Sequence, residues 1–306
     1  MLLSTTIAGI KLENPTILAS GILGVSRSSL KNVMNKGAGA CVIKSISLEP
    51  RKGHNAPNMI TFEAGMINAV GYSNPGVEAA QKEFSNLKEL GKPVIASIIG
   101  TDEKEFAAMA ETFLPGEFSA VEVALSCPHT PGYGTLAGQN TPENTEKITK
   151  AVREKTKLPI FIKISPDSNP IGEVVKGAEA GGADAITAVN TMGPGMIIDI
   201  QTGQPILDFK MGGISGPALH PIAVRCIYDI RKAVKLPIIG CGGITYGKDS
   251  IEMMMAGASA VEIGTGVYYR GVDVFKKVTD EIKTFMQHKG YNKLDDFIGL
   301  THKLEE

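Results

Sequence analysis

The sequence lacks the features that mark membrane, secreted and nucleic-acid-binding proteins. Its 306 residues hold no run of about 18 apolar residues and no charged start followed by a long apolar segment, so we expect neither a membrane span nor a signal peptide. The formal net charge is -1 without long runs of like charge, which argues against nucleic acid as a partner. The four cysteines show no CxxC spacing, so we expect free thiols, no cysteine metal site and a reducing, cytoplasmic location.

A glycine-rich dinucleotide fingerprint is also missing, because residues 19–25 read ASGILGV where G-x-G-x-x-G would stand. Instead, short apolar runs recur along the chain and read as strands buried on both faces. These runs span 14–21, 40–47, 93–100, 120–127, 158–166, 183–191, 236–244 and 258–266. Amphipathic stretches such as 102–114 and 144–157 lie between them. A doubly wound sheet is the alternative, but eight strand–helix units favour a single (β/α)8 TIM barrel, one domain over 1–306.

Two insertions interrupt the repeat, at residues 50–74 and 192–216. Both follow the carboxyl end of a predicted strand. Active sites of (β/α)8 barrels are built from the loops at that end. The insertions therefore predict a functional site on the C-terminal face.

Polar residues stand where several apolar runs end. Lys44 and Lys163 each end an apolar run, in VIKS and FIKIS, and lysine is rarely buried without a partner. Either one could form a barrel-end salt bridge. Two lysines at one barrel mouth favour a shared anionic or electron-rich ligand.

Glycine-rich turns close the last two predicted strands. They read GCGG at 240–243 and GTG at 264–266. Glycine lets backbone N–H groups approach a ligand closely, and barrels often bind phosphate at these two turns. The turns predict a phosphate-bearing cofactor.

Cys127 is the strongest candidate for a catalytic residue, and it lies in the segment VALSCPHTPGYG at 123–134. A buried structural thiol is the plainer interpretation, and it suits Cys41 and Cys226. Cys127 differs because Pro128 ends the strand and a glycine-rich stretch follows. A thiol at a barrel mouth can act as a nucleophile or a proton acceptor, and residues 129–141 could form a lid over it.

Together these motifs resemble the class 1 dihydroorotate dehydrogenases, over residues 14–270 and in the family's order. The similar segments are NPTILASG, VIKSISLEPR, GMINAVGYSNPGVE, SCPH, IKISP, VNT, GGISGPA, IIGCGGI and IGTG. INAVGYSNPGVE is similar to the class 1B catalytic subunit, and SCPH followed by GYG resembles archaeal members. The resemblance implies an FMN-binding barrel that oxidises dihydroorotate to orotate in pyrimidine biosynthesis.

The resemblance also implies roles for individual residues. Cys127 would be the base that removes the C5 proton while C6 gives a hydride to FMN. The implied FMN contacts are Ser20, Lys44, Ser45, Ser97, Lys163, Val189, Gly216, Gly242, Gly243, Gly264 and Thr265. The implied dihydroorotate contacts are Lys44, Asn68, Ala69, Val70, Gly71, Tyr72, His129, Asn190 and Thr191.

Three positions depart from the family pattern. Ala124 and His129 stand where asparagines are usual around the SCP motif, and Ser97 replaces an asparagine on the third strand. Ala124 cannot hydrogen-bond, so water or His129 must replace that contact, or orotate binding is weakened. Action on another dihydropyrimidine, a non-catalytic flavin-binding subunit and a flavin-free phosphate-binding barrel enzyme remain open alternatives.

The resemblance further implies partners for the chain. We expect a homodimer, and a heterotetramer with an electron-transfer subunit that carries FAD and an iron–sulfur cluster is possible. No metal site is expected on the chain itself.

Overall fold

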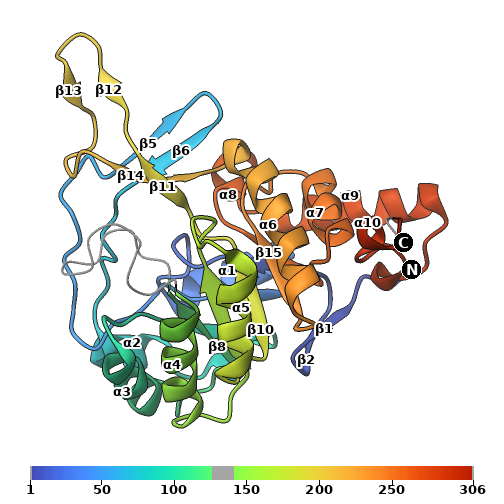
Figure 1. The fold of residues 1–306 in the computed structure, drawn as a ribbon, viewed down its shortest axis with the longest axis horizontal. Coiled ribbons are helices and arrows are strands. Elements are labelled where there is room, and N and C mark those ends of the chain that lie inside the picture. Colours follow the sequence, from blue (N-terminus) through green and yellow to red (C-terminus); the bar gives the residue numbers. More distant parts are fainter. Residues whose placement is uncertain (1, 126–140, 305–306) are drawn as a thin grey trace.

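A computed structural model describes residues 2–125 and 141–304. Its centre is a closed barrel of eight parallel strands in the order β10-β15-β16-β3-β4-β7-β8-β9 (Figure 1). The barrel strands are β3 (Thr16–Leu18), β4 (Ala40–Val42), β7 (Val94–Ile98), β8 (Ala120–Ala124), β9 (Ile160–Ile164), β10 (Ala185–Ala188), β15 (Ile238–Cys241) and β16 (Ala260–Ile263). Each lies within one of the eight apolar runs, so the predicted (β/α)8 barrel is confirmed.

Helices surround the barrel and cover its outer face (Figure 1). They are α1 (Arg27–Asn35), α2 (Val77–Glu83), α3 (Glu103–Phe113), α4 (Pro142–Arg153), α5 (Ile171–Ala180), α6 (His220–Ala233), α7 (Gly247–Met255), α8 (Gly266–Arg270), α9 (Val274–Lys289) and α10 (Leu300–Lys303). Short 3-10 turns occur at Leu87–Leu90, Pro217–Leu219 and Leu294–Asp296. No helix within residues 2–125 and 141–304 is long and apolar enough to cross a membrane.

Local sequence signals explain where the predicted helices begin. The Asp102 carboxylate accepts hydrogen bonds from the Lys104 and Glu105 amides at the start of α3. At α4, Thr141 Oγ1 accepts from the Asn144 amide, and Pro142 occupies the first helical position. Both caps satisfy amides that have no partner inside the helix, which fixes each helix start beside its strand.

The interior of the barrel is apolar at its N-terminal end. Small and large residues alternate there, and the cluster includes Ala40, Ala120, Phe161, Ala185, Ile239 and Ala260. Ile7 and Leu12 join the same cluster from the hairpin of β1 (Thr5–Ile7) and β2 (Ile10–Leu12). This hairpin, which the sequence analysis did not predict, covers the N-terminal end of the barrel, and the opposite end is left for a site.

The two predicted insertions form a single structure. β5 (Met59–Phe62) and β6 (Gly65–Asn68) come from the first, and β11 (Met192–Gly195) and β14 (Gly212–Ser215) come from the second. They make one antiparallel sheet in the order β11-β14-β6-β5, because Ile214 pairs with Ile67. The hairpin of β12 (Ile198–Asp199) and β13 (Gln204–Pro205) projects beyond it (Figure 1). The insertions thus add a wall at the C-terminal end of the barrel, where the cavity described next is found.

Candidate active site

A cavity of about 410 Å³ opens at the carboxyl ends of the barrel strands. Its walls come from barrel strands and from the insertion sheet. The predicted residues that line it are Ser20, Lys44, Ser45, Asn68, Val70, Gly71, Tyr72, Lys163, Val189, Asn190, Thr191, Gly216, Gly242, Gly243, Gly264 and Thr265. The cavity thus brings together residues that lie up to about 245 positions apart in the chain.

Four predicted site residues do not line this cavity in the described structure. Ser97 is buried behind it, and its Oγ lies 2.9 Å from Ser45 Oγ, so its contact with the site runs through Ser45. Ala69 is buried beside β6 and leaves the wall to its neighbours. Cys127 and His129 belong to residues 126–140, which are outside the described residues. The lid expected over 129–141 also lies outside them, except for residue 141. Their roles therefore stay predictions.

Lys44 presents an uncommitted ammonium group to the cavity. Within the described part of the chain, its Nζ has no ion pair or hydrogen bond, and burial lowers the pKa of this lysine. A buried cation without a counterion gains strongly from an anionic or electron-rich ligand. Lys44 therefore fits the expectation of a ligand-binding lysine.

Lys163 behaves differently, because it is already paired inside the protein. Its Nζ lies 2.7 Å from Glu262 Oε2 and 3.3 Å from Glu122 Oε1, and all three side chains are almost fully buried. The salt-bridge interpretation therefore holds for Lys163, while Lys163 and Glu262 also line the cavity. The sequence analysis missed both glutamates. A sequence pattern could have pointed to them, because Glu122 in AVEVA and Glu262 in AVEI each interrupt an otherwise apolar run.

The described cysteines are not activated. Burial raises the pKa of Cys41 to about 12 and of Cys226 to about 11, so both remain neutral thiols. Cys241 lines the cavity, and burial, opposed by Lys163, raises its pKa to about 12. A thiol nucleophile is therefore not found among these three residues.

The glycine turns after β15 and β16 differ in why they need glycine. Gly242 and Gly243 have φ of 127° and 72°, and a Cβ on Gly243 would lie 2.7 Å from the His220 Cβ. Their backbone shape thus requires glycine. At Gly264 the nearest atom to an added Cβ is the Ala19 Cβ at 3.6 Å, so the chain itself leaves room there. Space that a side chain would fill, next to backbone amides, suits a ligand that approaches the main chain.

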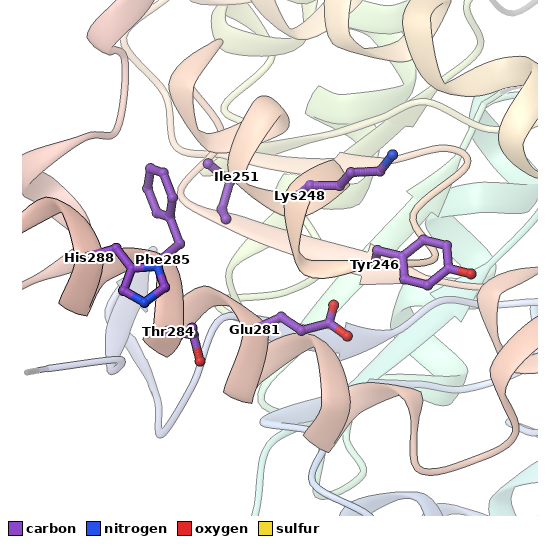
Figure 2. A pocket seen from close by; sticks show the side chains of 7 residues that line it. All are labelled: Tyr246, Lys248, Ile251, Glu281, Thr284, Phe285 and His288. Carbon is purple, nitrogen blue, oxygen red and sulfur yellow. The ribbon is translucent and has the colours of Figure 1, made fainter.

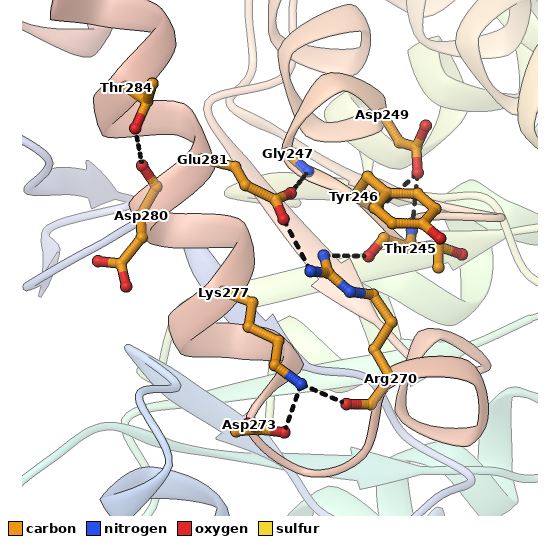
Figure 3. A network of polar contacts seen from close by, with 10 residues as sticks. All are labelled: Thr245, Tyr246, Gly247, Asp249, Arg270, Asp273, Lys277, Asp280, Glu281 and Thr284. Atoms are coloured by element: carbon orange, nitrogen blue, oxygen red, sulfur yellow. Dashed lines mark hydrogen bonds and ion pairs between the residues drawn. The ribbon is translucent and has the colours of Figure 1, made fainter.

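A network of polar contacts fixes these turns (Figure 3). Arg270 donates to Thr245 O at 3.1 Å and to Glu281 Oε1 at 2.8 Å, which ties the segment after β15 to α9. Glu281 also accepts from the Gly247 amide. Asp249 accepts from the Thr245 and Tyr246 amides at 2.8 and 2.7 Å. The network holds the β15 turn and α8 in one arrangement on the outer side of the cavity.

A second hollow lies between α7 and α9, away from the barrel mouth (Figure 2). Tyr246, Phe285 and His288 are among the residues that line it. None of the residues predicted for the site lines it. The cavity at the barrel mouth is therefore the candidate active site.

The insertion sheet and β10 supply amide and hydroxyl groups to the cavity. Asn68 Nδ2 donates a long hydrogen bond, 3.4 Å, to Gly213 O. Asn190 Oδ1 accepts from the Thr191 amide at 2.9 Å, which sets the direction of its side chain. These groups can bind a small polar ring, since amides offer both donors and acceptors.

Ala124 lines the cavity where the family pattern has asparagine. It pairs in register with Lys163 on the neighbouring strand, and its side chain is buried. No hydrogen-bonding group is supplied from this position, so the departure lies within the candidate site itself.

Fold and cavity define a class: a (β/α)8 barrel with glycine turns after the seventh and eighth strands and a polar, lysine-containing mouth. Comparison with known proteins identifies the member of that class. Residues 2–286 match the family described as dihydroorotate dehydrogenase, and the chain belongs to this family.

Relatives match over nearly the whole chain and carry one name, dihydroorotate dehydrogenase B (NAD(+)), catalytic subunit. The protein of Methanocella arvoryzae is 45% identical over 99% of both chains. That of Pyrococcus horikoshii is 44% identical over 99% of both chains, and that of Methanocaldococcus jannaschii is 43% identical over 99% of both. The resemblance to class 1B members is thereby confirmed.

Proposed function

We propose that this chain oxidises dihydroorotate to orotate with bound FMN, as the catalytic subunit of an NAD-linked enzyme of pyrimidine biosynthesis. The observation that carries the proposal is the gathering of family-matched residues around one cavity at the barrel mouth. Family membership and the name shared by the relatives support the same activity.

The residues present fit FMN. The turns at Gly216, Gly242 and Gly243, with the open space at Gly264, suit a phosphate that approaches backbone amides. Thr265 adds a hydroxyl, held by its 2.8 Å hydrogen bond to Ser215 Oγ. Lys44 and Lys163 also line the cavity, where their ammonium groups can face an electron-rich ring system.

When bound, FMN supplies the acceptor for the hydride from C6 of the substrate. The chain's own residues bind, orient and deprotonate. Asn68, Asn190 and Thr191 are proposed to hold the polar groups of the pyrimidine ring, and Lys44 its negative charge. Cys127, two residues after the buried Leu125, is proposed as the base for the C5 proton.

Further subunits are also part of the proposal. The relatives are named as catalytic subunits of NAD-linked enzymes, which implies a second kind of subunit for them. We extend this to the present chain as a homodimer that combines with an electron-transfer subunit carrying FAD and an iron–sulfur cluster.

An anaerobic titration tests the activity. The purified chain should be yellow with one FMN per chain, and dihydroorotate should bleach the flavin band with release of orotate. Asn68→Ala should weaken orotate binding by about 5- to 150-fold, the effect of one lost hydrogen bond in a dry site. Asn35→Ala on the exposed surface of α1 is the matched control and should change nothing.

Three outcomes would contradict the proposal. A colourless protein excludes the flavin. A yellow protein that only another dihydropyrimidine reduces changes the substrate. A yellow protein that no dihydropyrimidine reduces points to the non-catalytic subunit.

A further inference from the structure

Inside the barrel, a layer of polar side chains lies next to the apolar layer, on its side towards the carboxyl ends of the strands. Apolar residues such as Ala120, Phe161 and Ala260 face the barrel axis, and side chains two positions further along a strand face the same way. The polar inward-facing residues of this next layer are Ser97, Glu122, Lys163, Thr187, Cys241 and Glu262. Two acidic groups and one basic group thus share a closed space at the floor of the cavity.

The contacts within this layer are short and buried. Lys163 Nζ is 2.7 Å from Glu262 Oε2, 3.3 Å from Glu122 Oε1 and 3.4 Å from Ser20 Oγ. Ser20 Oγ in turn donates to Glu122 Oε1 at 3.3 Å. Both glutamate side chains are 0% exposed, so water does not screen their charges. The group Glu122, Lys163 and Glu262 is called the floor cluster below.

The charges of the floor cluster do not balance if both glutamates are ionised. One ammonium and two carboxylates leave a net charge of -1 on buried side chains, which is strongly unfavourable. Moreover, Glu122 Oε2 and Glu262 Oε1 are buried and have no hydrogen-bond partner among the residues that the structure describes. Two ionised carboxylates can only accept, but one proton turns one of them into a donor. A single proton on the pair therefore removes the excess charge and can give an unpartnered oxygen a partner.

The pKa values of Glu262 and Lys163 agree with a single proton on the carboxyl pair. Burial and then the neighbouring Glu122 raise the pKa of Glu262 to about 8, although Lys163 opposes the shift. The pKa of Lys163 lies well above its ordinary value, because Glu122 and Glu262 outweigh the effect of burial. Glu262 therefore loses its proton around pH 8, while Lys163 stays charged.

Among the described residues, the other barrel strands around Glu262 present a neutral thiol and hydroxyl groups. β15 presents Cys241, a thiol with a pKa of about 12. β3, β7 and β10 present the hydroxyls of Ser20, Ser97 and Thr187. From β8 and β9 come Glu122 and Lys163 themselves, and Lys44 stands beyond β4 on the cavity wall. Within the floor cluster, Glu262 is thus the group whose charge changes near pH 8.

We propose that Glu262 is a positioning residue that keeps one proton on the carboxyl pair, so that Lys163 meets the bound flavin from a cluster with no net charge. The inference rests on the proposed FMN site, but it does not depend on dihydroorotate as the substrate. Reduction adds negative charge to a flavin, so a cluster that becomes negative at high pH disfavours the reduced form. Acting through a protein interior with an effective dielectric constant of about 20, one added charge near the flavin shifts the equilibrium roughly tenfold.

The test is the midpoint potential of bound FMN as a function of pH, in the wild-type holoenzyme and in Glu262→Gln. Glutamine fixes the neutral state, so the two potentials should coincide below pH 8 and separate above it. At high pH the midpoint potential of the variant should be more positive than that of the wild type by about 30 mV. This corresponds to a tenfold change in the reduction equilibrium of a two-electron couple. Parallel pH profiles for the two proteins would overturn the proposal.

Two further variants test the partner carboxyl group and provide a control. In Glu122→Gln, the midpoint potential should also lack the drop above pH 8 that is expected for the wild type. In that variant Glu262 alone would balance Lys163 and stay ionised. Glu111→Gln is the matched control, since it removes the same charge from the exposed surface of α3 and should leave the potential unchanged.

If Glu262→Gln does not fold, infrared spectroscopy of the wild-type holoenzyme decides. A protonated carboxyl band should be present at neutral pH and disappear as the pH rises above 8; its absence at neutral pH would refute the inference. Failure of the proposed function gives a different signal. A wild-type chain that binds no FMN refutes the cofactor site, whereas bound FMN with parallel profiles refutes only the role of Glu262.

Discussion

Lys163 Nζ and Glu262 Oε2 lie 2.7 Å apart, although 99 positions separate the two residues in the chain. Their strands, β9 and β16, are not neighbours in the barrel, so the pair forms across its interior. Lys44, the other lysine of the cavity, makes no such contact within the described residues. The two lysines should therefore respond differently to the same substitution.

Lys44→Met should leave folding intact and weaken binding of FMN and orotate by about 10- to 100-fold, as expected for a lost charged hydrogen bond. Lys163→Met should instead lower the free energy of unfolding by about 3–5 kcal/mol, because it leaves buried carboxylates without their counterion. Chemical denaturation and FMN titration of both variants measure the contrast. Equal stability losses would contradict the assignment of Lys163 as an internally paired lysine.

Gly264→Val should give a folded but colourless protein. The cavity wall has room for the new side chain, whose methyl groups would occupy the space left for the phosphate. Absorbance of the purified protein and circular dichroism check the two parts. Gly243→Ala is the comparison, and it should destabilise the fold itself because of the positive φ and the contact with His220. Stoichiometric FMN in Gly264→Val would refute this placement of the phosphate.

Cys127→Ala should keep FMN but slow flavin reduction by dihydroorotate by about 10²–10⁴-fold, the usual contribution of a positioned base. Stopped-flow absorbance under anaerobic conditions measures the rate. The wild-type rate should also rise with pH as the thiol ionises. Cys226→Ala is the matched control, since that thiol is buried in α6. Reduction of the Cys127 variant at the wild-type rate would show that another group removes the proton.

Ala124→Asn should tighten orotate binding or speed flavin reduction by about 5- to 150-fold, because it restores one hydrogen-bonding group in a dry site. Ala124 lines the cavity, so the added amide can face the ligand with little effect on folding. If His129 already supplies the contact, Ala124→Asn is neutral and His129→Ala is the damaging change. Orotate affinities of the two variants separate these cases, and no effect in either would weaken the pyrimidine assignment.

The pH dependence of stability offers a test without any flavin. The pKa of Glu262 is raised from its ordinary value of 4.5 to about 8, so the folded state binds a proton that the unfolded state has released between these values. Stability from this group is therefore full below pH 4.5 and declines as the pH rises towards 8, by about 1.4 kcal/mol for each unit of pKa difference. The stability of apo wild type relative to Glu262→Gln should fall across this window. A constant difference would contradict the raised pKa.

The amino-acid sequence by itself determined the barrel and much of the candidate site. Strand runs are local patterns, and a parallel barrel places every strand's carboxyl end on one face. Lys44, Lys163, Asn190 and the glycine turns could therefore be assigned to one mouth before any contact was known.

Only the tertiary structure decided how these groups meet. The pairing of β6 with β14 joins two insertions that no local pattern connects. Closure of the barrel brings Glu122 and Glu262 onto Lys163, and it leaves Ser97 behind Ser45. Sequence alone shows that an acidic residue interrupts an apolar run. Which charge balances it depends on side chains that face one another across the barrel, and therefore on the register of every strand in between.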